Sequence, residues 1–345
     1  MLLFVTFFAL FATITGTAHY PKRFTDHFVK FLMNNPHRNK FALNSYVVNE
    51  EAGTFGGRTD VDDDKHVLQN IRHDPVVFVH GNQESALYHS PTATGWNKQI
   101  EHFLGAGYSM VEMYGLTHGH RNVAVALANR FTCEMFMGVR RNIEAVIDYT
   151  QTDKIDVISH SMGVTIARAA ILGGTVHFTD ETCHLGKSLA SKVDTFIGIA
   201  GANYGVCYCS NYLLMLHRAC TNDAFATGIC RVGNDTDEDM KINAPINCAL
   251  EGVSCDNPYS SVLRQLNDRN ERVADFTVST WTTNDEIIGP TNMAWGKRTS
   301  HIPLSDLTIE YGELSHGQIK DLTAAHQLAL ITMHSLDAQL PHVRY

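Results

Sequence analysis

The chain has no surplus of positive charge. Its 345 residues contain 27 lysines and arginines against 36 aspartates and glutamates, which gives a formal net charge of −9 at pH 7. A protein that binds the phosphates of nucleic acid, or that stays bound to an anionic membrane, needs a basic surface. The composition therefore gives no reason to expect a nucleic-acid partner, and it disfavours constitutive binding to anionic membranes.

The apolar run at the N-terminus is too short to cross a bilayer. Residues 1–18 are firmly apolar over about 14 positions and end in the small residues Gly16 and Ala18, whereas a membrane span needs about 20. No basic residue precedes the run, but its length is typical of a signal peptide. We expect residues 1–18 to be cleaved, so that the mature protein is secreted, extracellular and without a transmembrane segment.

Paired Cys-x-x-Cys motifs, which are typical of structural zinc sites, are missing. An even number of cysteines in a secreted chain indicates disulfides instead, although the sequence leaves their pairing open. Six of the eight crowd into residues 207–255, together with the N-glycosylation sequon Asn234-Asp235-Thr236, which favours an exposed loop. The eight are Cys133, Cys183, Cys207, Cys209, Cys220, Cys230, Cys248 and Cys255.

Apolar runs alternate with amphipathic helical patterns from residue 74 onward. A chain that alternates in this way forms a mostly parallel sheet with helices on both faces. We therefore predict one α/β domain at residues 19–345, in which residues 19–73 are an irregular covering segment with one amphipathic helix around residues 24–32. Strands are predicted at residues 74–82, 108–114, 155–158, 196–200, 276–281 and 307–311. Helices are predicted at residues 96–104, 133–149, 164–171 and 319–336.

The connection between the fourth and fifth of these strands is far longer than an ordinary crossover. This insertion, residues 201–272, contains six of the cysteines and the apolar run at residues 212–216. Long insertions at the carboxyl ends of strands often act as lids or as walls of a substrate pocket. A disulfide-pinned surface decoration is the alternative, and the sequence leaves both open.

Residues 154–163 (Lys-Ile-Asp-Val-Ile-Ser-His-Ser-Met-Gly) compress a strand, a tight turn and the start of a helix into one short stretch. Such a turn lifts its central side chain, here Ser161, clear of the sheet, and Gly163 lets the strand and the helix approach each other. This is the geometry of a nucleophile elbow, Gly-x-Ser-x-Gly, with Ser159 in place of the first glycine. The string alone is more often an ordinary turn, so its partners must be sought at other strand ends.

Residues that follow parallel strands meet at one edge of the sheet. Asp285 follows the strand at 276–281 and His316 follows the strand at 307–311, which is the order of an α/β-hydrolase. His316 could take the proton of the Ser161 hydroxyl, and Asp285 could orient the imidazole. Glu286 is the alternative acid, because it lies on the same turn. Packing, polar-network or surface roles are expected for His80, His118, His120, His160 and His301.

A carbonyl carbon under attack leaves a negative oxygen, which requires two preset hydrogen-bond donors. Met162, which follows the nucleophile at the start of the helix, supplies one backbone N–H. The other is expected from the loop after the strand at 74–82. There the N–H of Asn82 is the first choice and that of Gln83 is the alternative.

Four motifs in one order resemble the class 2 lipases of the α/β-hydrolase superfamily. This family includes secreted nematode proteins and is similar in its core to small bacterial triacylglycerol lipases. The motifs are Val-Val-Phe-Val-His-Gly-Asn at residues 76–82, Asp-Val-Ile-Ser-His-Ser-Met-Gly-Val-Thr-Ile-Ala-Arg at 156–168, Asn-Asp-Glu-Ile-Ile-Gly at 284–289, and His316. The resemblance extends over roughly residues 74–335.

The resemblance implies that Ser161 is the nucleophile, Asp285 the acid and His316 the base, with Asn82 and Met162 around the oxyanion. It also implies hydrolysis of carboxylic esters without a metal or another cofactor. The chain departs from the small bacterial members in two places. They usually have alanine at the first elbow position, and they lack a large lid such as residues 201–272 would form.

We therefore expect a secreted serine ester hydrolase, a triacylglycerol lipase or carboxylesterase, that acts on lipid or simple esters through an acyl-Ser161 intermediate. Its expected partners are the substrate and, transiently, a lipid interface. An acyltransferase with the same three side chains is one alternative, and product analysis with a competing alcohol distinguishes it. A catalytically silent lipid-binding homologue is the other, and labelling with a fluorophosphonate distinguishes that.

Overall fold

The computed structural model describes most of the chain from residue 23 to residue 336. The described residues are 23–41, 43, 53–59, 70–119, 121, 127–210, 216–228, 230–231, 248, 254–255, 258–289, 291–336 and 343–344. The expected signal peptide at 1–18, the sequon at 234–236 and most of the apolar run at 212–216 lie outside them.

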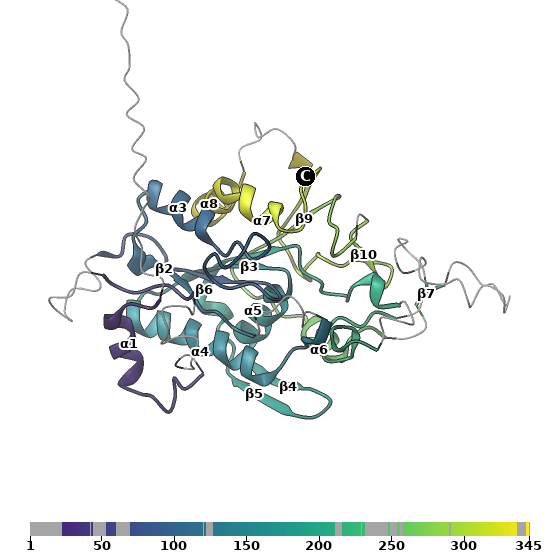
Figure 1. Cartoon of the computed structure of the whole chain (residues 1–345), viewed down its shortest axis with the longest axis horizontal. Helices are drawn as coiled ribbons and strands as arrows, with labels where there is room; N and C mark the ends of the chain where they lie inside the picture. The colour runs from purple at the N-terminus through teal and green to yellow at the C-terminus, as the bar shows by residue number, and fades with distance from the viewer. Residues whose placement is uncertain are drawn as a thin grey trace, which may run out of the picture.

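Within these residues, a seven-stranded sheet forms the centre of the molecule (Figure 1), in the order β13-β12-β9-β6-β3-β1-β2. Six of its strands, β1, β2, β3, β6, β9 and β12, are parallel, and β13 pairs antiparallel with β12 at the edge. The predicted α/β class with a mostly parallel sheet is confirmed. The strands are β1 (Val76–Val79), β2 (Met113–Gly115), β3 (Ile155–His160), β6 (Val193–Ile199), β9 (Phe276–Thr282), β12 (Leu307–Tyr311) and β13 (Val343–Arg344).

Every residue of β1 and β3 is buried. Strands with both faces covered favour apolar side chains on both, which explains why β1 reads as a continuous apolar run rather than as an alternating one. β3 lies between β1 and β6, where Ser159 is in register with Val79 on one side and with Gly198 on the other. The carboxyl end of β3 therefore opens at the middle of the sheet.

Helices cover both faces of the sheet (Figure 1) and bury a separate apolar cluster on each. α3 (Asn97–Gly105), α7 (Gln318–Leu322) and α8 (Ala324–Met333) cover one face, and α1 (Asp26–Met33), α4 (Cys133–Thr150) and α5 (Met162–Leu172) cover the other. In the described part of the chain, every helix falls short of the length and apolarity that crossing a bilayer requires.

Two predicted elements are interrupted. The strand predicted at 108–114 is a 3-10 turn, η3 (Met110–Glu112), followed by the short β2. The turn forms because the Glu112 carboxylate accepts a hydrogen bond from the N–H of Ser109 at 2.7 Å, as in a capping box. The helix predicted at 319–336 is divided into α7 and α8 at Thr323, whose φ of −107° and ψ of 18° lie outside the α-helical range.

Several short elements were not predicted, because they bury few side chains. The hairpin β4 (Gly174–His177) and β5 (Thr182–Gly186) follows α5 and buries Val176, Cys183 and Leu185. A one-turn helix, η5 (Ala190–Lys192), leads into β6. A second hairpin, β10 (Met293–Ala294) with β11 (Lys297–Arg298), precedes β12.

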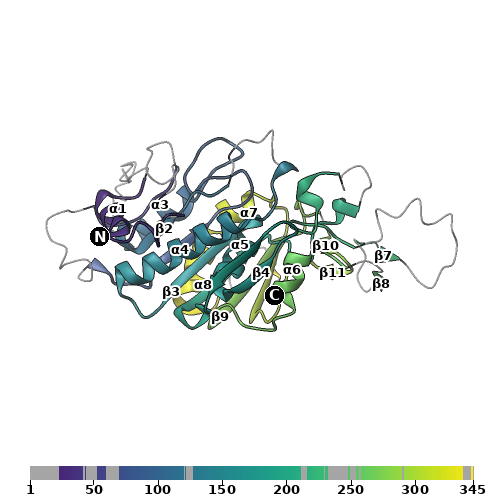
Figure 2. The ribbon, with the colours of Figure 1, turned by 90° about the horizontal axis from the view of Figure 1, so that it is seen from below.

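The described part of the insertion is made of short elements. They are η6 (Cys207–Ser210), η7 (Arg218–Cys220), β7 (Cys230–Arg231), β8 (Ser254–Cys255) and α6 (Ser261–Asn267). A disulfide connects two of them, η6 and η7. β7 and β8 lie at the end of the molecule opposite α1 (Figure 2). The prediction of disulfides is confirmed within the described residues, which contain the bonds Cys133–Cys183, Cys207–Cys248 and Cys209–Cys220. Cys255 is disulfide-bonded as well.

Candidate active site

Ser161 occupies the turn between β3 and α5. Its φ of 54° and ψ of −126° are a conformation that residues other than glycine rarely adopt and that persists only where neighbouring contacts impose it. The N–H of Ser161 donates to the carbonyl of Ile199 on β6 at 2.8 Å, and its carbonyl accepts from the N–H of Val164 at 3.0 Å. Strand, strained turn and helix thus follow one another as the sequence predicts.

The first position of this turn accommodates serine because the neighbouring strand uses its hydroxyl. Ser159 is fully buried, and its Oγ donates to the carbonyl of Ile197 on β6 at 3.1 Å. A buried hydroxyl without such a partner would be unfavourable. Serine therefore fits where a smaller residue is usual.

Two glycines bring the loop after β1 close to Ser161. A Cβ on Gly163 would lie 2.4 Å from the carbonyl oxygen of His80, and a Cβ on Gly81 would lie 2.9 Å from the Cβ of Ser161. Neither distance is possible for a real side chain, so any larger residue would push the loop and the turn apart. Glycine at both positions sets the spacing between Ser161 and the loop that carries Asn82.

Asp285 and His316 form a buried hydrogen-bonded pair. Nδ1 of His316 lies 2.8 Å from Oδ2 of Asp285, while Oδ1 of Asp285 accepts from the N–H groups of Ile287 and Ile288 at 2.9 and 2.7 Å. Burial raises the pKa of Asp285, but the bonds from His316 and from the two N–H groups outweigh it, so that the pKa lies below its ordinary value. An ionised Asp285 accepts Nδ1–H, which leaves Nε2 of a neutral His316 without a proton.

The Glu286 side chain binds the backbone of the same histidine. Its Oε2 accepts the N–H of His316 at 2.9 Å, whereas Asp285 contacts the imidazole. Asp285, the acid that the sequence favours, and Glu286, its alternative, therefore contact different atoms of one residue. Asp285 has the contact that an acid in a catalytic triad needs.

The Asn82 N–H is oriented by its neighbour. Nδ1 of His80 donates to the carbonyl of Gly81 at 2.8 Å, and in a trans peptide the Asn82 N–H points in the opposite direction from that carbonyl. The Asn82 side chain is fixed separately, since its Oδ1 accepts from Asn129 at 2.5 Å. Met162 is the first residue of α5, so its N–H has no acceptor within the helix.

Two buried histidines stabilise the loop after β1 in their neutral form. The rings of His80 and His118 stack with centroids 3.9 Å apart, and Nε2 of His80 accepts the N–H of His118 at 3.0 Å. Burial lowers the pKa of His80 to about 4 and holds that of His118 well below its ordinary value. Neutral His80 therefore donates through Nδ1 and accepts through Nε2 at the same time.

Glu84 and Lys320 form a buried ion pair beside this loop, which sequence reasoning missed. Nζ of Lys320 lies 2.8 Å from Oε1 of Glu84, and Oε2 of Glu84 accepts the N–H of Gly81 at 2.9 Å. Glu84 is 7 % exposed and Lys320 is 0 % exposed. A carboxylate three residues after a glycine turn was a usable signal for Glu84, but the apolar pattern of the last predicted helix gave none for Lys320.

The candidate residues line one cavity of about 520 Å³. Ser161, His316 and Asn82 lie in its wall, and Asp285 lies behind His316. The apolar residues of its lining, here called the apolar side, are Leu127, Ala202, Val206, Tyr208, Ala219, Phe225, Ile287 and Ile288. The polar residues, here called the polar side, include Gln83, Thr92, Thr94, Gln318 and Asp321.

The insertion builds most of the apolar side and is fastened to the core. The N–H of Val206 donates to the carbonyl of Phe225 at 3.1 Å, and the Phe225 ring packs 5.0 Å from that of Phe131. Arg168 on α5 donates to the side-chain oxygens of Asn203 and Asn267 at 2.7 and 2.9 Å. The insertion therefore supplies a wall of the cavity through Ala202, Val206, Tyr208, Ala219 and Phe225.

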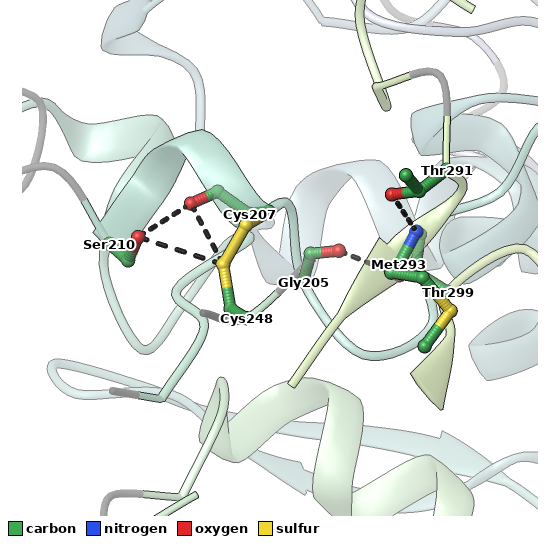
Figure 3. The surroundings of a disulfide bond; sticks show 7 residues. All are labelled: Gly205, Cys207, Ser210, Cys248, Thr291, Met293 and Thr299. Atoms are coloured by element: carbon green, nitrogen blue, oxygen red, sulfur yellow. Dashed lines mark hydrogen bonds between the residues drawn. A yellow bond between two sulfur atoms is a disulfide. The ribbon is translucent and has the colours of Figure 1, made fainter. Parts of the chain in front are cut away.

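Disulfides cross-link this wall. Figure 3 shows the Cys207–Cys248 bond and, beside it, Ser210, whose hydroxyl donates to the carbonyl of Cys207 at 2.8 Å. The same view shows Thr299, whose hydroxyl donates to the carbonyl of Gly205 at 2.6 Å. The start of the insertion is thus connected both to a disulfide and to the segment that follows β11.

Solved structures similar to this chain include several lipases. Aspergillus fumigatus lipase B is 15 % identical, with a TM-score of 0.47, over 84 % of this chain and 58 % of that protein. The chain thus spans little more than half the length of that lipase. Paleococcus ferrophilus monoacylglycerol lipase is 14 % identical, with a TM-score of 0.44, over 76 % of this chain and 97 % of that protein. Bacillus licheniformis lipase BlEst2 is 13 % identical, with a TM-score of 0.45, over 81 % of this chain and 97 % of that protein.

No protein among the curated sequences matches this chain. The family described as Lipase (class 2) does match, over residues 73–329. That range extends from the start of β1 to the middle of α8 and contains Ser161, Asp285 and His316. Since the match covers most of the sequence, the chain belongs to the class 2 lipase family.

Proposed function

We propose that this protein is a serine hydrolase of carboxylic esters. The observation that carries the proposal is the buried bond between Asp285 and His316 at the wall of the cavity that also exposes Ser161 on a strained turn. Family membership supports the same reaction class. Asn82 and Met162 complete the set that the reaction needs.

In the first half of the reaction, Oγ of Ser161 attacks the carbonyl carbon of the ester while Nε2 of His316 takes the hydroxyl proton. The imidazolium that forms is stabilised by the ionised Asp285. The N–H groups of Asn82 and Met162 receive the negative oxygen of the tetrahedral intermediate. His316 then returns the proton to the leaving alcohol, and an acyl-Ser161 remains.

In the second half, water enters where the alcohol left. His316 takes a proton from the water as its oxygen attacks the acyl carbon, and a second tetrahedral intermediate forms in the same oxyanion site. The carbon–Oγ bond breaks, Ser161 recovers its proton from His316, and a carboxylic acid is released. No atom outside the chain, the ester and water is required.

The two sides of the cavity support a lipid or another ester with one apolar part. The acyl chain fits the wall that the insertion builds, because Val206, Ala219 and Phe225 offer apolar surface there. The alcohol part fits the polar side near Thr94 and Gln318. Secretion remains part of the proposal, since the described disulfides are typical of an oxidising compartment.

Labelling by a fluorophosphonate tests the proposal directly. The wild-type protein should bind the probe covalently at one residue and hydrolyse p-nitrophenyl esters. Ser161→Ala should lose both, by roughly 10⁵- to 10⁶-fold in kcat, with unchanged circular dichroism. Ser188→Ala, which removes an exposed hydroxyl outside the cavity, is the matched control. Ester turnover that persists in folded Ser161→Ala would overturn the proposed function.

A further inference from the structure

We propose that Glu84, held ionised by Lys320, is a positioning residue for both the oxyanion donor and the catalytic histidine. The inference deepens the proposed function and rests on it. Both carboxylate oxygens of Glu84 are engaged by protein groups, so Glu84 acts through its neighbours and not on the substrate.

The first neighbour is the loop after β1. Oε2 of Glu84 accepts the N–H of Gly81 at 2.9 Å, which closes a turn of four residues around Asn82. His80 holds the next peptide, between Gly81 and Asn82, by donating to the Gly81 carbonyl. With Gly81 held at both its N–H and its carbonyl, the Asn82 N–H is fixed in position and direction.

The second neighbour is His160, which precedes the nucleophile. Nδ1 of His160 lies 3.2 Å from Oε2 of Glu84, and Nε2 lies 2.9 Å from the carbonyl oxygen of His316. The His160 and His316 rings are 4.7 Å apart, centroid to centroid. Burial lowers the pKa of His160, and a neutral ring has one N–H for these two acceptors. His160 therefore lies between Glu84 and the backbone of the catalytic histidine, and it donates to one of them while it contacts the other.

Lys320 explains why a buried Glu84 stays ionised and can accept these hydrogen bonds. Its ammonium lies 2.8 Å from Oε1 of Glu84 and also donates to Oγ1 of Thr94 at 3.0 Å and to the carbonyl of Gly95 at 2.9 Å. Burial alone would favour the protonated acid, which accepts fewer hydrogen bonds. The attraction of Lys320 and His160 outweighs burial and holds the pKa of Glu84 well below its ordinary value.

Lys320 also fixes the catalytic histidine from the other side. It lies on α7, which begins two residues after His316. The ion pair therefore links the loop after β1 to the helix after His316, over a separation of 236 residues in sequence. One buried pair sets the distance between the oxyanion donor and the base.

The test compares Glu84→Gln with wild type by steady-state kinetics. Displacing an oxyanion donor weakens interactions made only in the transition state, so kcat should fall roughly 10- to 100-fold while KM stays within about threefold. Affinity for a boronic acid, which forms a tetrahedral adduct on the serine, should fall by a similar factor. Added salt should restore neither kcat nor the affinity for the boronic acid, because the ion pair of Glu84 and Lys320 is buried.

Glu112→Gln is the matched control. Glu112 is a fully buried carboxylate that also accepts backbone N–H groups, those of Ser109 and His73 at 2.7 and 2.8 Å. It precedes β2 and therefore lies at the opposite edge of the sheet from the cavity. Its substitution should lower the melting temperature and leave kcat within twofold of wild type.

The double variant Glu84→Gln with Lys320→Met removes the unpaired charge, so it covers the case in which Glu84→Gln does not fold. It should recover thermal stability but keep the low kcat and the weak boronate affinity. A folded double variant with wild-type kcat, or a Glu84→Gln kcat no lower than that of Glu112→Gln, would overturn the positioning role. A wild-type protein that neither labels nor turns over would instead overturn the proposed function, and with it this inference.

Discussion

Nδ1 of His316 lies 2.8 Å from Oδ2 of Asp285, and the other oxygen of that carboxylate is fixed by backbone N–H groups. Asp285 is 1 % exposed, so water does not compete for this bond. The carboxylate consequently selects the tautomer of His316 whose Nε2 can accept a proton.

Asp285→Asn should abolish most of the activity without unfolding the protein. An amide in place of the carboxylate can donate to Nδ1 and so favours the wrong tautomer of His316, and it does not stabilise the imidazolium. By analogy with other hydrolases of this kind, kcat should fall by roughly 10³- to 10⁴-fold. Stopped assays with p-nitrophenyl butyrate would measure the loss.

Glu286→Gln provides the contrast. Its side-chain oxygen can still accept the N–H of His316, as the Glu286 carboxylate does at 2.9 Å. We expect kcat to fall by less than about tenfold, because the imidazole keeps its own acid. Equal losses in the two variants would show that Asp285 has no special role.

The sequence predicted the parts of the site that follow from strand ends. Ser161, Asp285 and His316 each come after an apolar run, and parallel strands bring such positions to one edge. The choice between Asp285 and Glu286 required the structure, because two adjacent carboxylates on one turn differ only in where the turn aims them.

The pair of Glu84 and Lys320 was beyond sequence reasoning for a different reason. A lysine in an amphipathic helix is usually exposed, and nothing in its own segment indicates that a carboxylate 236 residues away will reach it. The break at Thr323 was also invisible, because the apolar spacing continues across α7 and α8. Predictions from the local pattern succeed where burial alone determines the position of a side chain. They fail where a single tertiary contact determines it.

Val206→Phe should shift ester preference toward short acyl chains. Val206 lines the apolar side of the cavity and is held by its backbone bond to Phe225, so a larger side chain would occupy the space of the acyl chain. The ratio of kcat/KM for a twelve-carbon ester to that for a four-carbon ester should fall about tenfold or more. Thr92→Ala on the polar side should leave this ratio unchanged, and an unchanged ratio in Val206→Phe would argue against an acyl site on the insertion wall.

Gly163→Ala should destabilise the protein and lower its kcat. The added Cβ would meet the carbonyl oxygens of His80 and Val79 at 2.4 and 2.5 Å, and backbone atoms cannot turn aside as side chains do. We expect a loss of about 1–3 kcal/mol in the free energy of unfolding together with a lower kcat, since β1 and α5 must separate. Gly105→Ala, where nothing lies within 4 Å of an added Cβ, should change neither quantity appreciably.

Stability should decline as the pH falls from 6.5 toward 4. Burial lowers the pKa of His80 from 6.5 to about 4, so over this range the unfolded chain binds a proton that the folded protein does not. Above pH 6.5 His80 is neutral in both states and does not reduce the free energy of unfolding. Between pH 6.5 and pH 4 this free energy falls by up to about 3 kcal/mol because of His80. His118 acts in the same direction, and so does Glu84, whose depressed pKa favours the folded state above its ordinary value of 4.5.

Urea unfolding at pH 7.5, 5.5 and 4.5 would measure this decline in the free energy of unfolding. His80→Asn, which cannot take up a proton in the unfolded chain, should be less stable at pH 7.5 but should lose less stability as the pH falls. The contrary outcome is that the free energy of unfolding changes with pH equally in wild type and in His80→Asn. Proton uptake by His80 in the unfolded chain would then not account for the pH dependence. It would follow that the neutral ring does not hold the Gly81 carbonyl and, through it, the Asn82 N–H.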